Sequence, residues 1–272
     1  MNSEISLRFN LFPGGKNRAL TLSYDDGPDH DRRLVETLNA HGLKGTFHLN
    51  SSSLGKAGRV GLDEVRKLFA GHEISAHSVT HPNLEALPPE QLAWEMLEDR
   101  RALERLAGYP IRGMSYPFGS HSPEVVAALP HFGIEYARTV SSHNGFNLPT
   151  NWLLWHPTCH HKSNITDKLE AFIKTNAWGR PLLYYVWGHS YEFANDNNWE
   201  IIERFAEAAG ALADQIWFAT NIQIYDYQQA VKRLRISADR RLIENPNFQT
   251  VWFTVNGQPR ELAGGQSIEL MD

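Results

Sequence analysis

Short apolar segments alternate with helical stripes through most of this 272-residue chain. Each apolar segment has the length of a strand, and each stripe repeats at the three- and four-residue spacing of one helix face. Strands that alternate with helices in this way pair in parallel, because each helix returns the chain to the same end of the sheet. We therefore predict an α/β fold with a parallel sheet closed or nearly closed into a barrel, and functional groups on the loops after the strands.

The expected elements follow from periodicity and from helix boundary residues. Strands are expected at 19–22, 45–49, 73–76, 111–116, 134–137, 182–187 and 215–219. Helices are expected around 34–38, at 62–69, from Pro88 to about residue 107, after Ser122, and at 165–174, 199–209 and 227–234.

The pattern changes near residue 236. Segments 251–255 and 259–262 flank Asn256-Gly257, which favours a hairpin with a type I′ turn, and 267–270 is a further strand candidate. We expect two parts, a barrel over 1–235 and a small C-terminal β appendage over 236–272 that covers an edge or an end of the barrel.

Two short strings suggest a metal site, SYDDGPD at 23–29 and HSVTH at 77–81. With one carboxylate as ligand, Asp26, His77 and His81 form an oxygen and nitrogen ligand set that leaves positions open for water and substrate. Asp25 would then stand beside the attacking water as a base. The alternatives are an ordinary turn at Asp-Asp-Gly-Pro and two surface histidines, but both strings follow expected strands.

Two later strand ends add candidates. The string SYPFG places Tyr116, Pro117 and Phe118 at the same rim, where the Phe118 backbone N–H could face a developing oxyanion. The strand LLYYVWGH delivers His189, a candidate general acid. We interpret the one cysteine, Cys159, as a structural residue rather than a nucleophile.

These motifs together resemble the polysaccharide deacetylases of carbohydrate esterase family 4, over about residues 18–225. The resemblance implies an irregular (β/α) barrel with seven or eight units. It also implies Asp25 as base, Asp26, His77 and His81 as ligands of a divalent metal, the Phe118 amide as oxyanion donor and His189 as acid. The expected metal is zinc, with cobalt, manganese or nickel as alternatives.

Two features depart from the family pattern. The family usually carries an arginine two residues before the proline of SYPFG, to pair with the base, but this chain has Ser115 there. The family also has an aspartate near a tryptophan that tunes the acid, and around Asn151-Trp152 no such aspartate is evident. If the following segment is extended, His156 and His160 share one face, and either could replace the missing partner.

The expected substrate is an acetylated saccharide or a related small molecule. Four aromatic residues near the motifs, Trp152, Trp155, Trp187 and Tyr191, are candidates to stack on sugar rings, although core packing is the commoner fate of such residues. An amidohydrolase acting on a non-sugar carbon–nitrogen bond and a catalytically silent carbohydrate-binding domain remain as alternatives.

Composition limits the classes of partner that we expect for this chain. The net charge of -5 gives no basic surface for nucleic acid. The start MNSEISLRFN has no basic residues followed by an apolar stretch, and no apolar run could cross a membrane, so we expect a cytoplasmic protein without a membrane partner. The oligomeric state cannot be predicted.

Overall fold

The computed structural model describes residues 5–270. The barrel strands are β2 (Arg18–Asp25), β3 (Gly45–Leu49), β4 (Glu73–Ala76), β5 (Gly113–Ser115), β6 (Tyr136–Arg138), β7 (Cys159–His160), β8 (Leu182–Gly188) and β9 (Ile216–Phe218). The α-helices are α1 (Asp31–Ala40), α2 (Val65–Leu68), α3 (Pro89–Ala107), α4 (Pro123–Ala128), α5 (Ile165–Lys174), α6 (Ser190–Asn195), α7 (Glu200–Gly210) and α8 (Asn221–Arg233).

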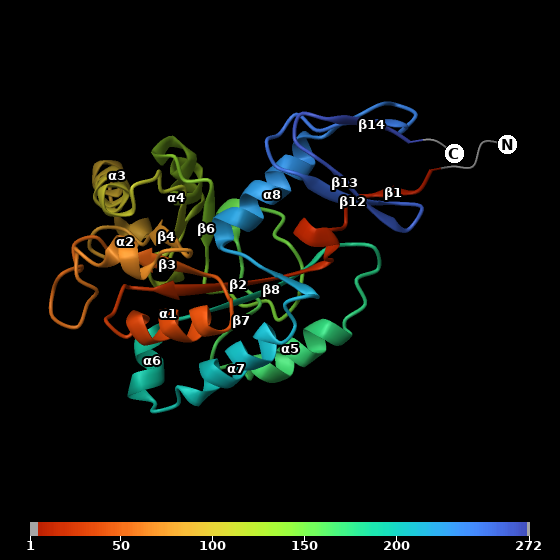
Figure 1. Cartoon of the computed structure of the whole chain (residues 1–272). Coiled ribbons are helices and arrows are strands. Elements are labelled where there is room, and N and C mark those ends of the chain that lie inside the picture. Colours follow the sequence, from red (N-terminus) through yellow and green to blue (C-terminus); the bar gives the residue numbers. More distant parts are fainter. Residues whose placement is uncertain (1–4, 271–272) are drawn as a thin grey trace.

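The eight strands form one curled sheet with helices on its outer face (Figure 1). The order is β6-β5-β4-β3-β2-β8-β7, and β9 pairs with the first residues of β2. Neighbouring strands are parallel, so they all end at one rim. The predicted irregular (β/α) barrel with a C-terminal β appendage is confirmed.

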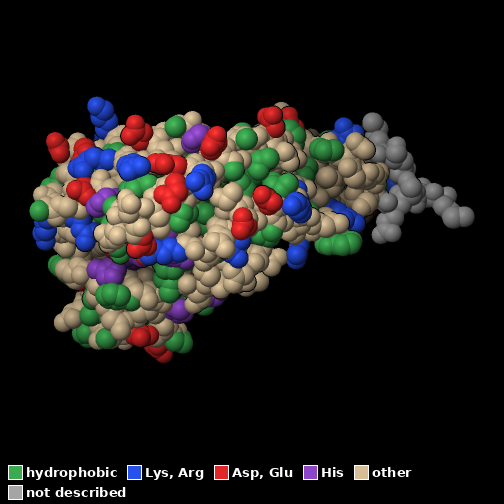
Figure 2. Space-filling view, turned by 90° about the horizontal axis from the view of Figure 1, so that it is seen from below, with side chains coloured by type: hydrophobic (Ala, Val, Ile, Leu, Met, Phe, Trp, Pro, Cys, Tyr) green, Lys and Arg blue, Asp and Glu red, His purple; other side chains and the backbone are tan. Residues whose placement is uncertain are grey.

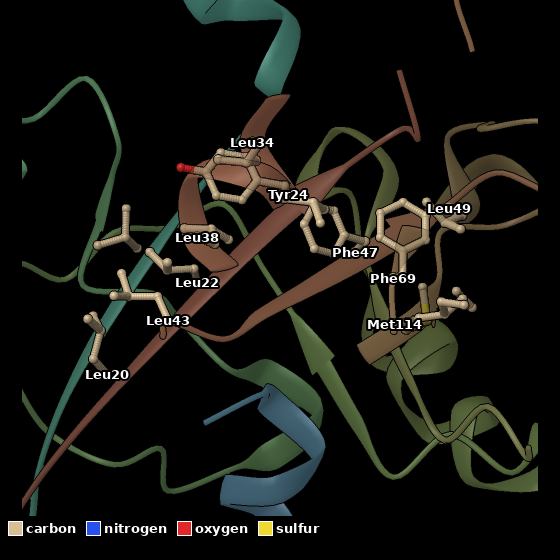
Figure 3. Packing of buried hydrophobic residues seen from close by; sticks show 14 of the residues in the cluster. Leu20, Leu22, Tyr24, Leu34, Leu38, Leu43, Phe47, Leu49, Phe69 and Met114 are labelled. Atoms are coloured by element: carbon tan, nitrogen blue, oxygen red, sulfur yellow. The ribbon is translucent and has the colours of Figure 1, made fainter. Parts of the chain in front are cut away.

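The outer face of the sheet is apolar because alternate residues of each strand point toward the helices. On β2, Leu20, Leu22 and Tyr24 point outward and are buried in one cluster with Leu34 and Leu38 of α1. Figure 3 shows these α1 leucines packed over the β2 side chains, with the Phe47 and Phe69 rings beside them. Burial of this apolar surface supplies most of the stability of such a fold.

The inner face of the sheet is polar. The β2 residues that alternate with the leucines, Thr21, Ser23 and Asp25, are all buried. Near the amino-terminal ends of the strands, the Thr21 hydroxyl donates to Asn221 Oδ1 (2.8 Å), and the Asn221 amide donates to Thr46 Oγ1 (2.9 Å). The first residues of α8 therefore close this end of the barrel through hydrogen bonds as well as apolar packing, since Ile224 is buried in a cluster with Ala19 and Leu183.

The barrel closes at the segment from Trp155 to β7. Trp155 forms a parallel bridge with Arg138 of β6, and its amide donates to Ala137 O (2.9 Å). A few residues later, Cys159 and His160 pair with β8. The segment thus joins the two ends of the sheet and buries the Trp155 ring.

Both ends of the chain contribute to the appendage. Its strands are β1 (Leu7–Arg8), β10 (Arg235–Ile236), β11 (Leu242–Glu244), β12 (Val251–Val255), β13 (Gln258–Leu262) and β14 (Ser267–Glu269). They form two three-stranded antiparallel sheets, β1-β12-β13 and β10-β11-β14, beside α8 (Figure 1). The predicted hairpin is confirmed, with Asn256 (φ 50°) and Gly257 (φ 78°) in its turn. The division at residue 235 remains a prediction.

The surface carries both signs of charge. Figure 2 shows acidic and basic side chains interspersed over one face, with histidines among them. Within residues 5–270, no helix combines the length and hydropathy needed to span a membrane.

Burial raises the pKa of the Glu73 carboxyl to about 7, so the free energy of unfolding should depend on pH through this group. In the unfolded chain this carboxyl ionises near pH ~4.3, so between about pH 4.5 and 7 the free energy of unfolding falls as pH rises. The Glu73→Gln variant lacks this ionisable group. Across that pH range we expect its free energy of unfolding to fall by roughly 3 kcal/mol less than that of the wild type, as measured by urea denaturation.

The matched control is Glu207→Gln, which changes an exposed carboxyl on α7 and should keep the wild-type slope. Burial also raises the pKa of Asp99 to about 7, so the Glu73→Gln slope should be smaller rather than zero. An unchanged slope in Glu73→Gln would show that this carboxyl is ionised in the folded protein at lower pH.

Candidate metal centre and active-site cleft

A cleft of about 500 Å³ opens at the rim where the barrel strands end. This is where functional groups of (β/α) barrels gather. Most residues predicted from the sequence line it, namely Asp25, Asp26, His77, His81, Tyr116, Phe118, Trp187, His189 and Tyr191.

Asp26, His77 and His81 bring one ligand atom each to within 4.8 Å of one another. Asp26 Oδ1 lies 3.6 Å from His77 Nε2 and 3.7 Å from His81 Nε2. Tetrahedral bonds of ~2.0–2.1 Å place ligand atoms ~3.3–3.4 Å apart, so a small closure would complete a zinc-like site. The chemistry and spacing of the three donors fit a divalent transition metal.

Ser115 orients His77. His77 Nδ1 lies 2.8 Å from the Ser115 carbonyl oxygen, which can only accept, so Nδ1 carries the proton and Nε2 presents its lone pair to the cleft. A partner of this kind on the second ring nitrogen is typical of metal-binding histidines. The residue that departs from the family pattern therefore still supports the candidate metal centre.

Helix α3 braces the loop that carries both histidines. Asp99 Oδ2 accepts from the His77 amide (3.1 Å), and Glu95 Oε2 accepts from the Thr80 amide (2.9 Å). Asp26 and His81 have positive φ, 78° and 60°, an unfavourable conformation for residues with a Cβ. Such strain at functional sites persists only where surrounding contacts enforce it.

Arg138 is the cation beside Asp25, and the sequence reasoning missed it. Its Nη2 forms an ion pair with Asp25 Oδ2, and both side chains are buried, with Arg138 0% and Asp25 2% exposed. Ser115 Oγ donates to Asp25 Oδ1 (3.1 Å). Burial alone would raise the pKa of Asp25, but the charges of Arg138 and His77 outweigh it and hold that pKa well below its usual range.

Glu192 is the carboxylate beside His189, and it too was missed. His189 Nδ1 lies 3.3 Å from Glu192 Oε2, whereas Nε2 faces Asp25 Oδ2 at 4.0 Å. Burial would lower the pKa of His189, but the hydrogen bond to Glu192 and the charge of Asp25 raise it above its usual value. Glu192 lies on α6, directly after β8, where we expected no helix.

The cleft walls combine a backbone donor with aromatic rings. Phe118 has φ 57°, and its amide has no hydrogen-bond acceptor among the described residues. The residue is 69% exposed, and its ring stands edge-on to His81, with centroids 4.3 Å apart. Trp187 lies against the Arg138 guanidinium (4.6 Å), and the Tyr191 ring lies 5.1 Å from that of His189.

Five predicted residues do not line the cleft, and one of them, Trp155, is fully buried. Pro117 is buried in the turn, and the Trp152 ring packs on Trp155, with centroids 4.7 Å apart. His156 Nδ1 forms a hydrogen bond with Thr139 Oγ1 (2.6 Å), and this histidine lines a different pocket. His160 Nε2 lies 3.0 Å from Glu192 Oε2, so it reaches the partner of His189 rather than His189 itself.

Cys159 is buried under the sheet, and burial raises the pKa of its thiol. A thiol of this kind is not activated as a nucleophile. The structural interpretation of this residue therefore agrees with its surroundings.

The Asp25–Arg138 pair generates a second prediction. Arg138→Met keeps most of the side-chain volume but leaves a buried carboxylate without its cation, so we expect a loss of about 3–5 kcal/mol in the free energy of unfolding. Adding Asp25→Asn should recover most of it, since no buried charge then remains. Urea denaturation of the two variants measures both changes.

The control is Arg235→Met, which breaks an exposed pair with Glu244 (2.8 Å) and should cost less than about 1 kcal/mol. If the double variant is as unstable as Arg138→Met alone, then packing rather than charge pairing accounts for the role of Arg138.

Comparison with known proteins finds a family that resembles the chain over part of its length. Residues 13–137 match the family model described as Polysaccharide deacetylase. The peptidoglycan-N-acetylglucosamine deacetylase of Bacillus cereus is 30% identical over 112 residues, which cover 40% of this chain and 39% of that protein. The chitooligosaccharide deacetylase of a Bradyrhizobium species is 26% identical over 121 residues, which cover 43% of this chain and 53% of that protein. The matched region thus spans about two fifths to one half of these relatives.

Solved structures share the fold. A Mycobacterium smegmatis protein described as a polysaccharide deacetylase superposes with a TM-score of 0.62 at 17% identity, over 81% of this chain and 93% of that one. The family 4 carbohydrate esterase of Streptomyces lividans, in complex with acetate, gives 0.50 at 16% identity, over 74% and 92%. The residues that match the family model include both strings SYDDGPD and HSVTH, so this part of the chain is similar to the polysaccharide deacetylases.

Proposed function

We propose that this protein is a metal-dependent hydrolase that removes acetyl groups from a carbohydrate. The main support for the proposal is that three kinds of functional group lie together in one cleft. A candidate metal centre, the carboxylate of Asp25 and the imidazole of His189 face one another, with His77 Nε2 and His189 Nε2 at 3.9 and 4.0 Å from Asp25 Oδ2.

Asp26, His77 and His81 would hold the metal, with zinc as our first candidate. When bound, a divalent metal supplies Lewis acidity that polarises the acetyl carbonyl and makes the attacking water more acidic. Asp25 takes the proton from that water. Because Arg138 keeps Asp25 ionised, this carboxylate is ready to accept a proton but is a weak base, which makes the acidity of the water important.

His189 acts as the acid on the leaving group. Its raised pKa keeps the imidazole protonated closer to neutral pH, and Glu192 holds the ring with Nε2 toward Asp25 and the cleft. The free Phe118 amide donates to the oxyanion that develops on the acetyl carbonyl. Protonation of the departing amine or alcohol then completes the release of acetate.

The substrate class follows from the cleft walls. Trp187, Tyr191 and Phe118 supply aromatic faces and edges, and such surfaces pack well on the apolar faces of sugar rings. The volume of about 500 Å³ accommodates a small saccharide portion, with the rest of a longer chain outside. Peptidoglycan N-acetylglucosamine and chitooligosaccharides, named in two relatives, are the first substrates to test.

The direct test is acetate release from a panel of chitooligosaccharides, peptidoglycan fragments and O-acetylated xylan, with zinc-loaded protein and an enzymatic acetate assay. We expect acetate from at least one substrate. If none releases acetate, the proposed reaction is wrong, and release of ammonia or formate from an amide panel would indicate an amidohydrolase instead.

Asp25→Asn should lower kcat by roughly 10²–10⁴-fold, because the general base is lost while the shape of the cleft is kept. Asp63→Asn makes the same chemical change at an exposed residue and should leave kcat unchanged. Equal activity of the two variants would remove Asp25 from the mechanism.

Removal of metal with a chelator should abolish acetate release, and zinc, cobalt, manganese or nickel should restore it to different extents. His81→Ala should weaken metal binding and raise the metal concentration needed for half-maximal activity. Full activity of protein shown to be metal-free by elemental analysis would contradict metal dependence.

A further inference from the structure

A second cluster of ligand atoms lies on the far side of His189 from Asp25. It consists of His160, His161 and Glu192, named here the His-His-Glu cluster, whose ligand atoms lie within 4.8 Å of one another. These residues come from β7, the residue after it, and α6, so two elements of the rim converge there. The proposed reaction gives His160 and His161 no role.

One carboxylate oxygen is the centre of the cluster. Glu192 Oε2 lies 3.0 Å from His160 Nε2 and 3.2 Å from His161 Nε2. A zinc ion with bonds of ~2.0–2.1 Å in tetrahedral geometry separates its ligand atoms by ~3.3–3.4 Å. The three donors thus lie close to the spacing that such an ion requires.

His161 is a buried polar side chain aimed into the cluster. It is 1% exposed, and although Nε2 lies 3.2 Å from Glu192 Oε2, neither ring nitrogen has hydrogen-bond geometry with a described residue. Buried polar atoms without partners are costly and call for an explanation such as an ion. A metal bound at Nε2 would satisfy the nitrogen that points at Glu192.

The fold fixes the His161 ring. It stacks between Tyr24 (centroids 5.9 Å apart) and Phe193 (4.1 Å). A Cβ on Gly188 would lie 2.1 Å from His161 Nδ1, so only glycine leaves room for the ring at that position. Rigid support of this kind is typical of metal ligands.

The nearest lysine faces the other carboxylate oxygen of Glu192 rather than Oε2. Lys162 Nζ lies 3.4 Å from the other oxygen, Oε1, and 2.7 Å from Asp196. His189 Nδ1 lies 3.3 Å from Oε2 and can supply a fourth donor. The donor set is therefore imidazole-rich with one carboxylate, which suits zinc, nickel or copper rather than magnesium or calcium.

We propose that the His-His-Glu cluster binds a second divalent transition metal, separate from the ion of the candidate active site. Because Glu192 also orients His189, binding at the cluster changes the hydrogen bonding of that imidazole. This consequence, an inhibition of turnover by excess metal, rests on the proposed function, whereas the binding site itself does not.

The test is zinc binding by the full chain after chelator treatment, with stoichiometry from elemental analysis and affinities from competition with a chromophoric chelator. We expect two zinc ions per wild-type chain. One should remain in His160→Ala, one in His77→Ala/His81→Ala, and none in the variant that combines all three changes. His131→Ala, an exposed histidine outside both clusters, should keep two.

His161→Phe is a second probe, because phenylalanine keeps the stack between Tyr24 and Phe193 but offers no nitrogen. It should lose one zinc ion with little change in thermal unfolding. If His77→Ala/His81→Ala binds no zinc while folded, or if His160→Ala and His161→Phe both retain two ions, the second site does not exist. Neither result depends on acetate release.

Discussion

The buried ion pair between Asp25 and Arg138 is the interaction on which the arrangement of the cleft depends. Asp25 ends β2 and Arg138 ends β6, and β3, β4 and β5 lie between them in the sheet. The two side chains therefore meet only when the sheet has curled enough to bring its edge over its centre. Transfer of two charges from water costs several kcal/mol per ion, and only close pairing with further hydrogen bonds offsets that cost. A functional carboxylate is thus tied to the closed form of the barrel.

The polar interior makes this pairing possible. A barrel filled with leucine would leave Asp25 in an apolar medium, but the buried residues of the strands include hydroxyls, imidazoles and carboxylates. At one end, α8 and Glu73 hold the network together, since the Ile222 amide donates to Glu73 Oε2 (2.9 Å). At the other end, Ser115 and Arg138 hold Asp25. Apolar packing outside and hydrogen bonding inside therefore divide the stabilisation of the sheet.

Local sequence patterns predicted what depends on local structure. Most barrel strands and most helices were found from periodicity, although the two-residue strand β7 was not, and Asp25, Asp26, His77 and His81 were found from two short strings. Arg138 was missed because its partner depends on the curl of the sheet, although an arginine directly after an apolar strand was a usable signal. Glu192 was missed because α6 has only six residues, too few for a clear period. Trp152 turns away from the cleft because a 3-10 turn, Trp152–Leu154, interrupts the segment that we treated as extended.

The adjacent carboxylates of Asp25 and Asp26 show how backbone conformation gives two neighbouring side chains different surroundings. Successive side chains on a strand point to opposite faces, so a regular continuation of β2 would turn Asp26 away from the interior. The positive φ of 78° at Asp26 breaks that alternation, and both carboxylates line the cleft. Asp25 remains in the strand, where the buried Arg138 reaches it, whereas Asp26 lies beyond the strand and faces two imidazoles. In the proposed function, the carboxylate paired with the arginine would serve proton transfer, and the carboxylate that faces two imidazoles would bind a metal.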